Sequence, residues 1–357
     1  MNAAKTPLFV VKVGTNVITE SNGFLNIGVL KELVTQIAEL KKKGVNIILV
    51  SSGAMAAGRA LLPQTDKTEN VVKRQMLAAV GQAALMKEYS ELFQHHGYLC
   101  AQVLTTKADF RTRQHYLNMQ NCFTALLKDN VVPIVNENDV VSVEELMFTD
   151  NDELAGLISS LMDAEKLIIL TSVDGVYDGP IGSGKVLTTI EPQSKLWKKH
   201  LQAGTSQFGK GGMHTKCAIA EKLAATGIAV HIVNGARSNV LLEIAAEKPI
   251  GTFFRPTKKA SHLKRWVAHA EGLEKGKVTV NACAADILAS TQVVSLLPVG
   301  ITNIEGDFVA GDIIQICRED GVKIGLGKAQ YDSEKAVAVI GKKGEKALIH
   351  YNYLYLL

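Results

Sequence analysis

The sequence has few cysteines, no long apolar run and no strong charge of either sign. Its five cysteines are scattered and form no C-x-x-C or zinc pattern, so neither a disulfide framework nor a structural zinc site is expected. No apolar stretch reaches the roughly 18 residues that a membrane helix needs. The formal net charge of +4 is too small to indicate nucleic-acid binding by itself.

Targeting signals and repeats are also missing. Residues 1–7 lead straight into a predicted strand without the apolar core of a signal peptide. No internal repeat or low-complexity tract is present. Hydrophobic residues make up 47% of the chain and charged residues 21%, as in ordinary globular proteins. We therefore expect a reduced, cytoplasmic protein, and 357 residues are enough for two domains.

Buried strands alternate with helical patterns over most of the chain. Apolar residues at helical spacing between Leu30 and Leu40, followed by three lysines and Gly44, are typical of the helices between the strands. This alternation predicts an α/β fold, an αβα sandwich with a mainly parallel central sheet. The predicted strands are Leu8–Val13, Val45–Val50, Tyr98–Leu104, Val131–Val135, Leu167–Thr171 and Ile228–Val233.

The pattern changes near residue 260, where a charged and poorly periodic connector begins. Short strands with glycine turns follow and predict a small, all-β, barrel-like domain. We therefore expect a large α/β domain over residues 1–260, a linker over 261–275 and a β-domain over 276–357. The predicted strands of the β-domain are Lys277–Val280, Gly306–Phe308, Asp312–Cys317, Gly325–Gly327 and Ala336–Ile340.

One lysine interrupts the first buried strand. Lys12 lies close to the end of that strand, and Gly14 and Thr15 follow where a turn must begin. A lysine in a buried strand is costly unless a negative group meets it, and small residues beside it let backbone N–H groups approach a phosphate. From these residues alone, a lysine that reaches solvent from an edge strand is an equally good interpretation.

Polar residues follow nearly every predicted strand of the sheet. Ligands of open α/β sheets bind beyond the carboxyl ends of the strands, so several polar clusters at this edge predict a binding site. The clusters are Lys12 with Gly14 and Thr15, Ser51-Ser52-Gly53, Asn136–Asp139, Thr171-Ser172 with Asp174, and Asn234-Gly235.

Two polar clusters open helices, which gives them a simpler interpretation as well. Ser51 or Ser52 could cap the next helix, or the helix N-terminus could bind a carboxylate or phosphate, and both can hold together. Asp150-Asn151-Asp152 begins another helix, whose cap needs only one such residue. The extra carboxylate could orient lysines or hold Mg²⁺.

A glycine-rich stretch precedes a further helix. Gly204–Lys210 fits the first part of a Walker A loop, but Gly211 stands where that loop needs Ser or Thr, and no strand clearly precedes it. A P-loop NTPase is therefore excluded. The glycines, Lys210 and Lys216 still predict a phosphate-binding loop. No G-x-G-x-x-G follows a strand and the protein-kinase signatures are absent, which argues against a Rossmann dehydrogenase and a protein kinase.

In combination, these motifs resemble the amino acid kinase family, and the C-terminal part resembles a PUA domain. The matching segments are Val11–Asn16, Val50–Arg59, Gln75–Gln82, Pro133–Asp139, Asp150–Asp152, Leu170–Tyr177 and Gly211–Lys216, with Ser295–Ile301 and Gly311-Asp312 in the PUA part. The resemblance implies ATP-dependent phosphorylation of the γ-carboxylate of L-glutamate with Mg²⁺, in proline biosynthesis. It also implies L-proline as a feedback inhibitor, and we expect a homo-oligomer.

The resemblance also implies roles for single residues. Lys12 would bind the ATP phosphates, and Asp152 would organise the lysines. Glutamate would be bound by Ser52, Asp139 and Asn151. The nucleotide would be bound by Thr171, Ser172, Lys210, Gly211, Gly212, Met213, His214, Thr215 and Lys216. Some relatives have Asp where this chain has Ser172, so a contact there is expected only through the backbone.

The implied reaction suits these residues. A glutamate side chain has a pKa of about 4.3 and is already ionised at neutral pH, so no general base is required. Phosphoryl transfer to it depends on positioning and charge neutralisation. Lys12 and Lys216 are the residues we expect to neutralise the transferring phosphoryl group.

Two other functions fit parts of the sequence. An acetylglutamate or aspartate kinase is disfavoured by the C-terminal β-domain and by the Asn136–Asp139 motif. An RNA-binding function is suggested by the PUA resemblance, because PUA domains often serve it. From Gly276 onward, however, eight Lys and Arg stand against nine Asp and Glu, a net charge of −1. This lacks the basic footprint of nucleic-acid binding.

Overall fold

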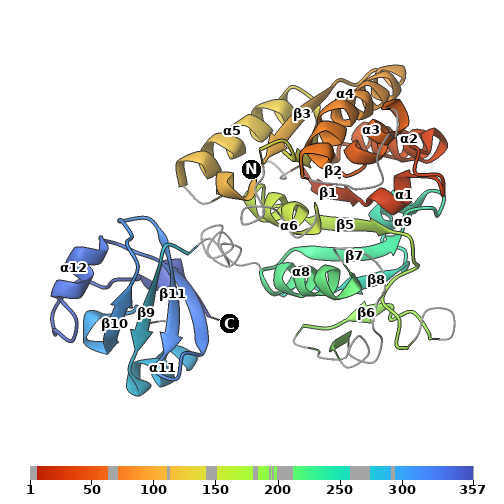
Figure 1. Ribbon diagram of the computed structural model, residues 1–357. Coiled ribbons are helices and arrows are strands. Elements are labelled where there is room, and N and C mark those ends of the chain that lie inside the picture. The colour runs from red at the N-terminus through yellow and green to blue at the C-terminus, as the bar shows by residue number, and fades with distance from the viewer. Residues whose placement is uncertain are drawn as a thin grey trace, which may run out of the picture. The chain divides into compact units, whose positions relative to one another are not determined.

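The computed structural model (Figure 1) describes most of the chain in two units. The first unit comprises Met1–Lys107 with Met119–Lys259, and the second comprises Ala108–Asn118 with Ala260–Leu357. The described residues are 6–62, 71–110, 113–141, 151–179, 184–192, 194, 197–198, 212–257, 274–290 and 294–356.

The first unit is built on an eight-stranded sheet with the order β3-β4-β2-β1-β5-β7-β8-β6. The first six strands of that order run parallel, β8 pairs antiparallel with β7, and β6 pairs parallel with β8. The strands are β1 (Leu8–Val13), β2 (Asn46–Ser51), β3 (Cys100–Thr105), β4 (Val132–Glu137), β5 (Lys166–Thr171), β6 (Thr189–Ile190), β7 (Ala229–Asn234) and β8 (Thr252–Phe254). The mainly parallel sheet is confirmed, and β1 lies at its centre.

Side chains alternate between the two faces of the sheet along each strand, so a buried apolar strand presents apolar residues on both faces. Helices cover both of these faces. Phe9, Val11 and Val13 of β1 share a core with α2, α4 and α9, whereas α6 contacts α8, β1 and β5. The helices along this part of the chain are α1 (Thr15–Ile18), α2 (Ile27–Lys42), α3 (Ala54–Leu61), α4 (Val71–His95), the 3-10 helix η1 (Lys107–Phe110), α5 (Arg113–Lys128), α6 (Asn151–Leu161), α8 (Met213–Ala225) and α9 (Val240–Ala245). Most of η1 and the start of α5 fall within Ala108–Asn118 and so belong to the second unit. The predicted αβα sandwich is confirmed.

The second unit carries a five-stranded sheet with the order β10-β9-β11-β12-β13, in which only β9 and β11 are parallel. Its strands are β9 (Gly276–Val280), β10 (Ile301–Glu305), β11 (Ile313–Arg318), β12 (Lys323–Lys328) and β13 (Leu354–Leu356). Its helices are α11 (Ala282–Ala289), α12 (Ser333–Ala338) and the 3-10 helices η3 (Pro298–Gly300) and η4 (Tyr351–Tyr353). Its sheet shares a separate apolar core with residues of α11 and α12.

Two strands predicted for the second unit are wrong. The predicted strand Ala336–Ile340 begins inside helix α12, because the Asp332 side chain accepts a hydrogen bond from the Lys335 N–H and caps that helix. The predicted strand Gly306–Phe308 begins at a turn after β10, where Gly306 has φ +85°. The domain is therefore not all-β, although its sheet was expected.

The loop that follows β2 is held by a close crossing of α3 and α4. A Cβ atom on Gly81 would overlap the carbonyl oxygen of Ala54 and the backbone nitrogen of Gly58. A Cβ atom on Gly58 would overlap the carbonyl oxygen of Leu77. The two backbones can therefore touch only because both positions are glycine.

None of the helices in the described ranges combines the length and apolar character that crossing a bilayer requires.

We expect Gly81→Ala to destabilise the protein by about 3 kcal/mol, because the added methyl group forces α4 away from α3. The matched control is Gly28→Ala in α2, where the nearest atom to the new Cβ is the Asn26 Oδ1 at 3.3 Å. Urea unfolding followed by circular dichroism measures both variants. Equal stability of the two variants would contradict this account of the crossing.

Candidate active site

A buried carboxylate holds two lysines side by side at the carboxyl edge of the sheet. Asp152 Oδ1 lies 2.6 Å from Lys12 Nζ, and its Oδ2 lies 2.8 Å from Lys216 Nζ. The Asp152 side chain is fully buried, and those of Lys12 and Lys216 are only 5% and 12% exposed. Three elements distant in sequence, β1, α6 and α8, therefore place one anion between two cations.

The charges of this cluster are mutually dependent. Burial alone would raise the pKa of the Asp152 carboxyl, but the ammonium groups of Lys12 and Lys216 outweigh burial and hold that pKa below its usual value. Asp152 is therefore ionised at neutral pH. The cluster carries two positive charges and one negative charge, so it attracts an anion.

The local sequence explains how each charge reaches this position. β1 lies between β2 and β5, so Lys12 pairs with Val50 on one side and Ile169 on the other and does not belong to an edge strand. The interpretation of Lys12 as a solvent-reaching edge lysine is therefore wrong. Asp152 lies in the first turn of α6, where the helix dipole favours a carboxylate. Lys216 lies in the first turn of α8.

A chain of amide side chains lies beside the charged cluster. The Asn151 Nδ2 donates to Ser52 Oγ at 2.8 Å and to Asn136 Oδ1 at 2.9 Å. The Asn136 Nδ2 in turn donates to Gln82 Oε1 at 3.0 Å. Two predicted glutamate-binding residues, Ser52 and Asn151, are thus brought together directly.

Neither Ser51, the last residue of β2, nor Ser52 caps the following helix. The N-cap of α3 is Gly53, with φ +104° and no side-chain capping hydrogen bond. The Ser51 Oγ instead lies 2.8 Å from the buried Tyr89 hydroxyl, and Ser52 accepts from Asn151. Because Gly53 takes the left-handed conformation, the backbone turns sharply between Ser52 and α3.

Asp139 has a different environment from the other predicted glutamate ligands. It follows β4 in a partly buried loop. Burial raises the pKa of its carboxyl above the usual value, and the positive charge of Arg74 partly offsets this. A carboxylate with this environment gains from a further cationic partner, such as an ammonium group.

The predicted nucleotide-binding residues that the structure describes lie on two separate segments, at the end of β5 and at the start of α8. Thr171 ends β5 with its carbonyl bonded to the Gly235 N–H at 2.8 Å, and Ser172 follows it on the surface. Gly212 is the N-cap of α8, and Met213, His214 and Thr215 lead to Lys216 in its first turn. Lys210, Gly211 and Asp150 lie outside the described residues.

Two residues of the amide chain were not assigned a role from the sequence. Asn136 lies in Asn136–Asp139 and Gln82 in Gln75–Gln82, but neither motif predicts a role for that residue. Gln82 is 8% exposed, and its Nε2 is buried without a hydrogen-bond partner in the described part of the chain. Its position on α4 between the buried residues Ala78 and Leu85 is the signal that could have identified it.

The donor set does not resemble a protein cage for a metal ion. Within the described residues, no three His, Cys, Asp or Glu side chains gather in a group that could hold one. Both oxygens of Asp152 already face lysines. Mg²⁺ commonly reaches kinase sites on the phosphates of the nucleotide with only one or two carboxylates.

Comparisons with known proteins identify the family of this chain. Residues 7–234 match the amino acid kinase family, and residues 276–351 match the PUA domain. The glutamate 5-kinase of Chlorobaculum tepidum is 51% identical over 98% of this chain and 97% of its own length. The glutamate 5-kinase of Bacteroides thetaiotaomicron is 49% identical over 97% of each chain. The chain therefore belongs to the amino acid kinase family, among the glutamate 5-kinases.

Proposed function

We propose that the site around Asp152 carries out the reaction of the glutamate 5-kinases, in which the γ-carboxylate of L-glutamate is phosphorylated by ATP in proline biosynthesis. A carboxylate oxygen forms a bond to the γ-phosphorus, the bond from that phosphorus to the β,γ-bridging oxygen breaks, and ADP leaves. The single observation that carries this proposal is the pair of ammonium groups held by one buried carboxylate.

Charge neutralisation is the task we assign to the lysines. The nucleophile and the transferring phosphoryl group are both anionic, so their approach is repulsive unless cations lie close to both. Lys12 and Lys216 supply these cations, and Asp152 fixes their spacing. The α8 N-terminus, with Gly212–Thr215, adds backbone N–H groups for the nucleotide phosphates. Thr171, Ser172, Lys210 and Gly211 complete the proposed nucleotide site.

Substrate positioning is the task we assign to the amide chain and Asp139. Ser52 and Asn151 are joined by a hydrogen bond and present polar atoms beside the charged cluster. The Asp139 carboxylate would accept hydrogen bonds from the α-ammonium group of glutamate. This ammonium group supplies the cationic partner that the environment of Asp139 favours. Asn136 and Gln82 hold Asn151 in place.

Mg²⁺ belongs to the nucleotide in this proposal, and its chemistry is to neutralise phosphate charge when MgATP binds. L-glutamate and ATP are therefore the proposed small-molecule partners. Inhibition by L-proline, a homo-oligomer and a cytoplasmic setting stay predictions.

A direct assay tests the proposed reaction. The full chain is incubated with L-glutamate, ATP and Mg²⁺, and hydroxylamine traps the acyl phosphate as a hydroxamate. N-acetylglutamate and aspartate are tested as alternative acceptors in separate reactions, because other amino acid kinases use them. We expect hydroxamate to form when L-glutamate is the acceptor and not when N-acetylglutamate or aspartate replaces it. Its absence, or a preference for another acceptor, would refute the assignment.

Lys216→Ala should lower kcat by about 10²–10³-fold with little effect on glutamate binding, by analogy with the loss of one oxyanion-hole donor. Lys222→Ala, in the last turn of the same helix, is the matched control and should leave kcat unchanged. Steady-state hydroxamate assays separate kcat from KM. Near-normal turnover of Lys216→Ala would mean that this lysine is only a helix residue.

Asn151→Ala and Asp152→Asn should have different effects although the residues are neighbours. Loss of the Asn151 amide should raise the KM for glutamate and leave the KM for ATP nearly unchanged, because its bonds reach Ser52 and Asn136. Asp152→Asn should lower kcat, because it releases both lysines. Indistinguishable kinetics for the two variants would overturn this division of roles.

A chain that ends near Glu271 should still make glutamyl phosphate. Every residue assigned to the chemistry precedes Gly235, and the first 270 or so residues are long enough to bury a core alone. Hydroxamate formation and sedimentation of this truncated protein are compared with those of the full chain. A folded, soluble but inactive truncated protein would show that residues 1–260 do not form a self-sufficient catalytic domain.

A further inference from the structure

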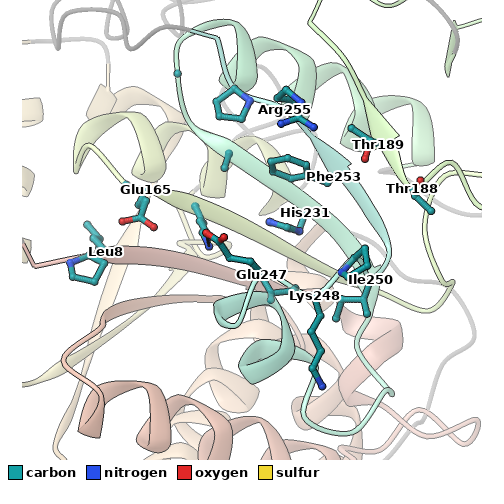
Figure 2. A pocket seen from close by; sticks show the side chains of 18 of the residues that line it. Leu8, Glu165, Thr188, Thr189, His231, Glu247, Lys248, Ile250, Phe253 and Arg255 are labelled. Carbon is teal, nitrogen blue, oxygen red and sulfur yellow. Dashed lines mark ion pairs between the residues drawn. The ribbon is translucent and has the colours of Figure 1, made fainter.

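A cavity of about 710 Å³ lies at the amino edge of the first sheet, at the opposite strand ends from Asp152. Figure 2 shows side chains from the beginnings of β1 and β7, from β8 and from the segment after α9 around this cavity. Lys166 is the first residue of β5 and lines the cavity, whereas Thr171 ends the same strand. Five residues of strand span roughly 17 Å, so the cavity is separate from the candidate active site.

The short helix α9 ends at the edge of this cavity. Ile244 of α9 belongs to the core on this face, but the helix ends at Ala245, and Glu247 then turns the chain with φ +58°. The side chains of His231 and Phe253 lie beyond the end of α9, on paired positions of β7 and β8. Both side chains line the cavity.

Lys166 is a buried cation with a loose anionic partner. The whole residue is 9% exposed, and its Nζ lies 5.2 Å from the centre of the Phe9 ring. Its ion pair with Glu247 is 4.0 Å long, and the Glu247 side chain is 85% exposed. A buried ammonium group is stabilised more strongly by a carboxylate at hydrogen-bond distance, near 2.8 Å.

His231 contributes an aromatic ring and an unsatisfied polar atom to the lining of the cavity. The residue is 7% exposed, and its Nδ1 is buried with no hydrogen-bond partner in the described ranges. Its ring stacks on Phe253 with centroids 4.8 Å apart. Burial, with the nearby charge of Lys166, lowers the pKa of the imidazole to about 4. The ring is therefore neutral at pH 7, and Lys166 is the cation beside it.

The other cations that line the cavity have close partners. Arg255 Nε lies 2.9 Å from Glu191, and its guanidinium also lies 5.7 Å from the centre of the Phe253 ring. Lys248 Nζ lies 3.1 Å from Glu243. Lys166, with its 4.0 Å partner, is the cavity cation that a ligand anion would stabilise most.

We propose that this cavity binds a small organic anion that consists of a carboxylate on a flat, apolar ring. The carboxylate replaces Glu247 as the partner of Lys166, and the ring lies against His231 and Phe253. The cavity volume falls within the range of roughly 300–1,000 Å³ that is typical of small-molecule sites.

The test uses benzoate as the probe and full-length protein labelled with ¹³C-histidine. The His231 ring resonance is assigned by comparison with His231→Phe. We expect benzoate to shift this resonance saturably, and benzamide, its neutral analogue, to bind at least about tenfold more weakly. In Lys166→Met the benzoate-dependent shift should be lost, whereas in the control Lys248→Met it should persist.

Glutamyl hydroxamate formation by Lys166→Met should match that of the unmodified chain, which shows that the variant is folded. If Lys166→Met does not fold, the proposal is tested by comparing the binding of benzoate with that of benzamide to the unmodified chain. An unshifted His231 resonance, equal binding of benzoate and benzamide, or a shift confined to His214 near Lys216 would each overturn the proposal.

Discussion

The ion pairs of Asp152 with Lys12 and Lys216 are the interaction on which the site depends. One buried carboxylate between two ammonium groups requires all three charges, because removal of one partner leaves a buried charge without compensation. The carboxylate comes from the first turn of α6 and the lysines from β1 and α8. The packing of both helices against the sheet therefore fixes the spacing of the two positive charges, and a small shift of either helix would change it.

The neighbours Asn151 and Asp152 link this cluster to a second set of contacts. Successive residues on an α-helix point about 100° apart, so one turns toward the lysines and the other toward Ser52 and Asn136. Through Asn136, the amide chain reaches Gln82 on α4, the helix whose glycine allows the close crossing with α3. The charged and the neutral parts of the site are thus held by different helices but meet at the start of α6.

The parallel sheet gives the first unit two chemically different edges. At the carboxyl edge, polar residues end or follow successive strands and form the candidate active site. At the amino edge, Lys166 and His231 line a cavity near the opposite ends of the strands. The sequence signalled the first edge through several polar clusters in loops. The residues of the second edge were not predicted, because Lys166 and His231 belong to none of the polar motifs that follow the strands.

The sequence by itself determined the alternation of strands and helices, the parallel sheet and most of the residues at its carboxyl edge, because these follow from local periodicity and motif spacing. It did not decide whether Lys12 binds phosphate or extends into solvent. It also misassigned Ala336–Ile340, whose apolar run suits a strand as well as a helix. The tertiary structure decided these points. Placing β1 between β2 and β5 buries Lys12, and only the approach of α6 and α8 supplies its partners, since contacts between distant segments leave no periodic trace in the chain.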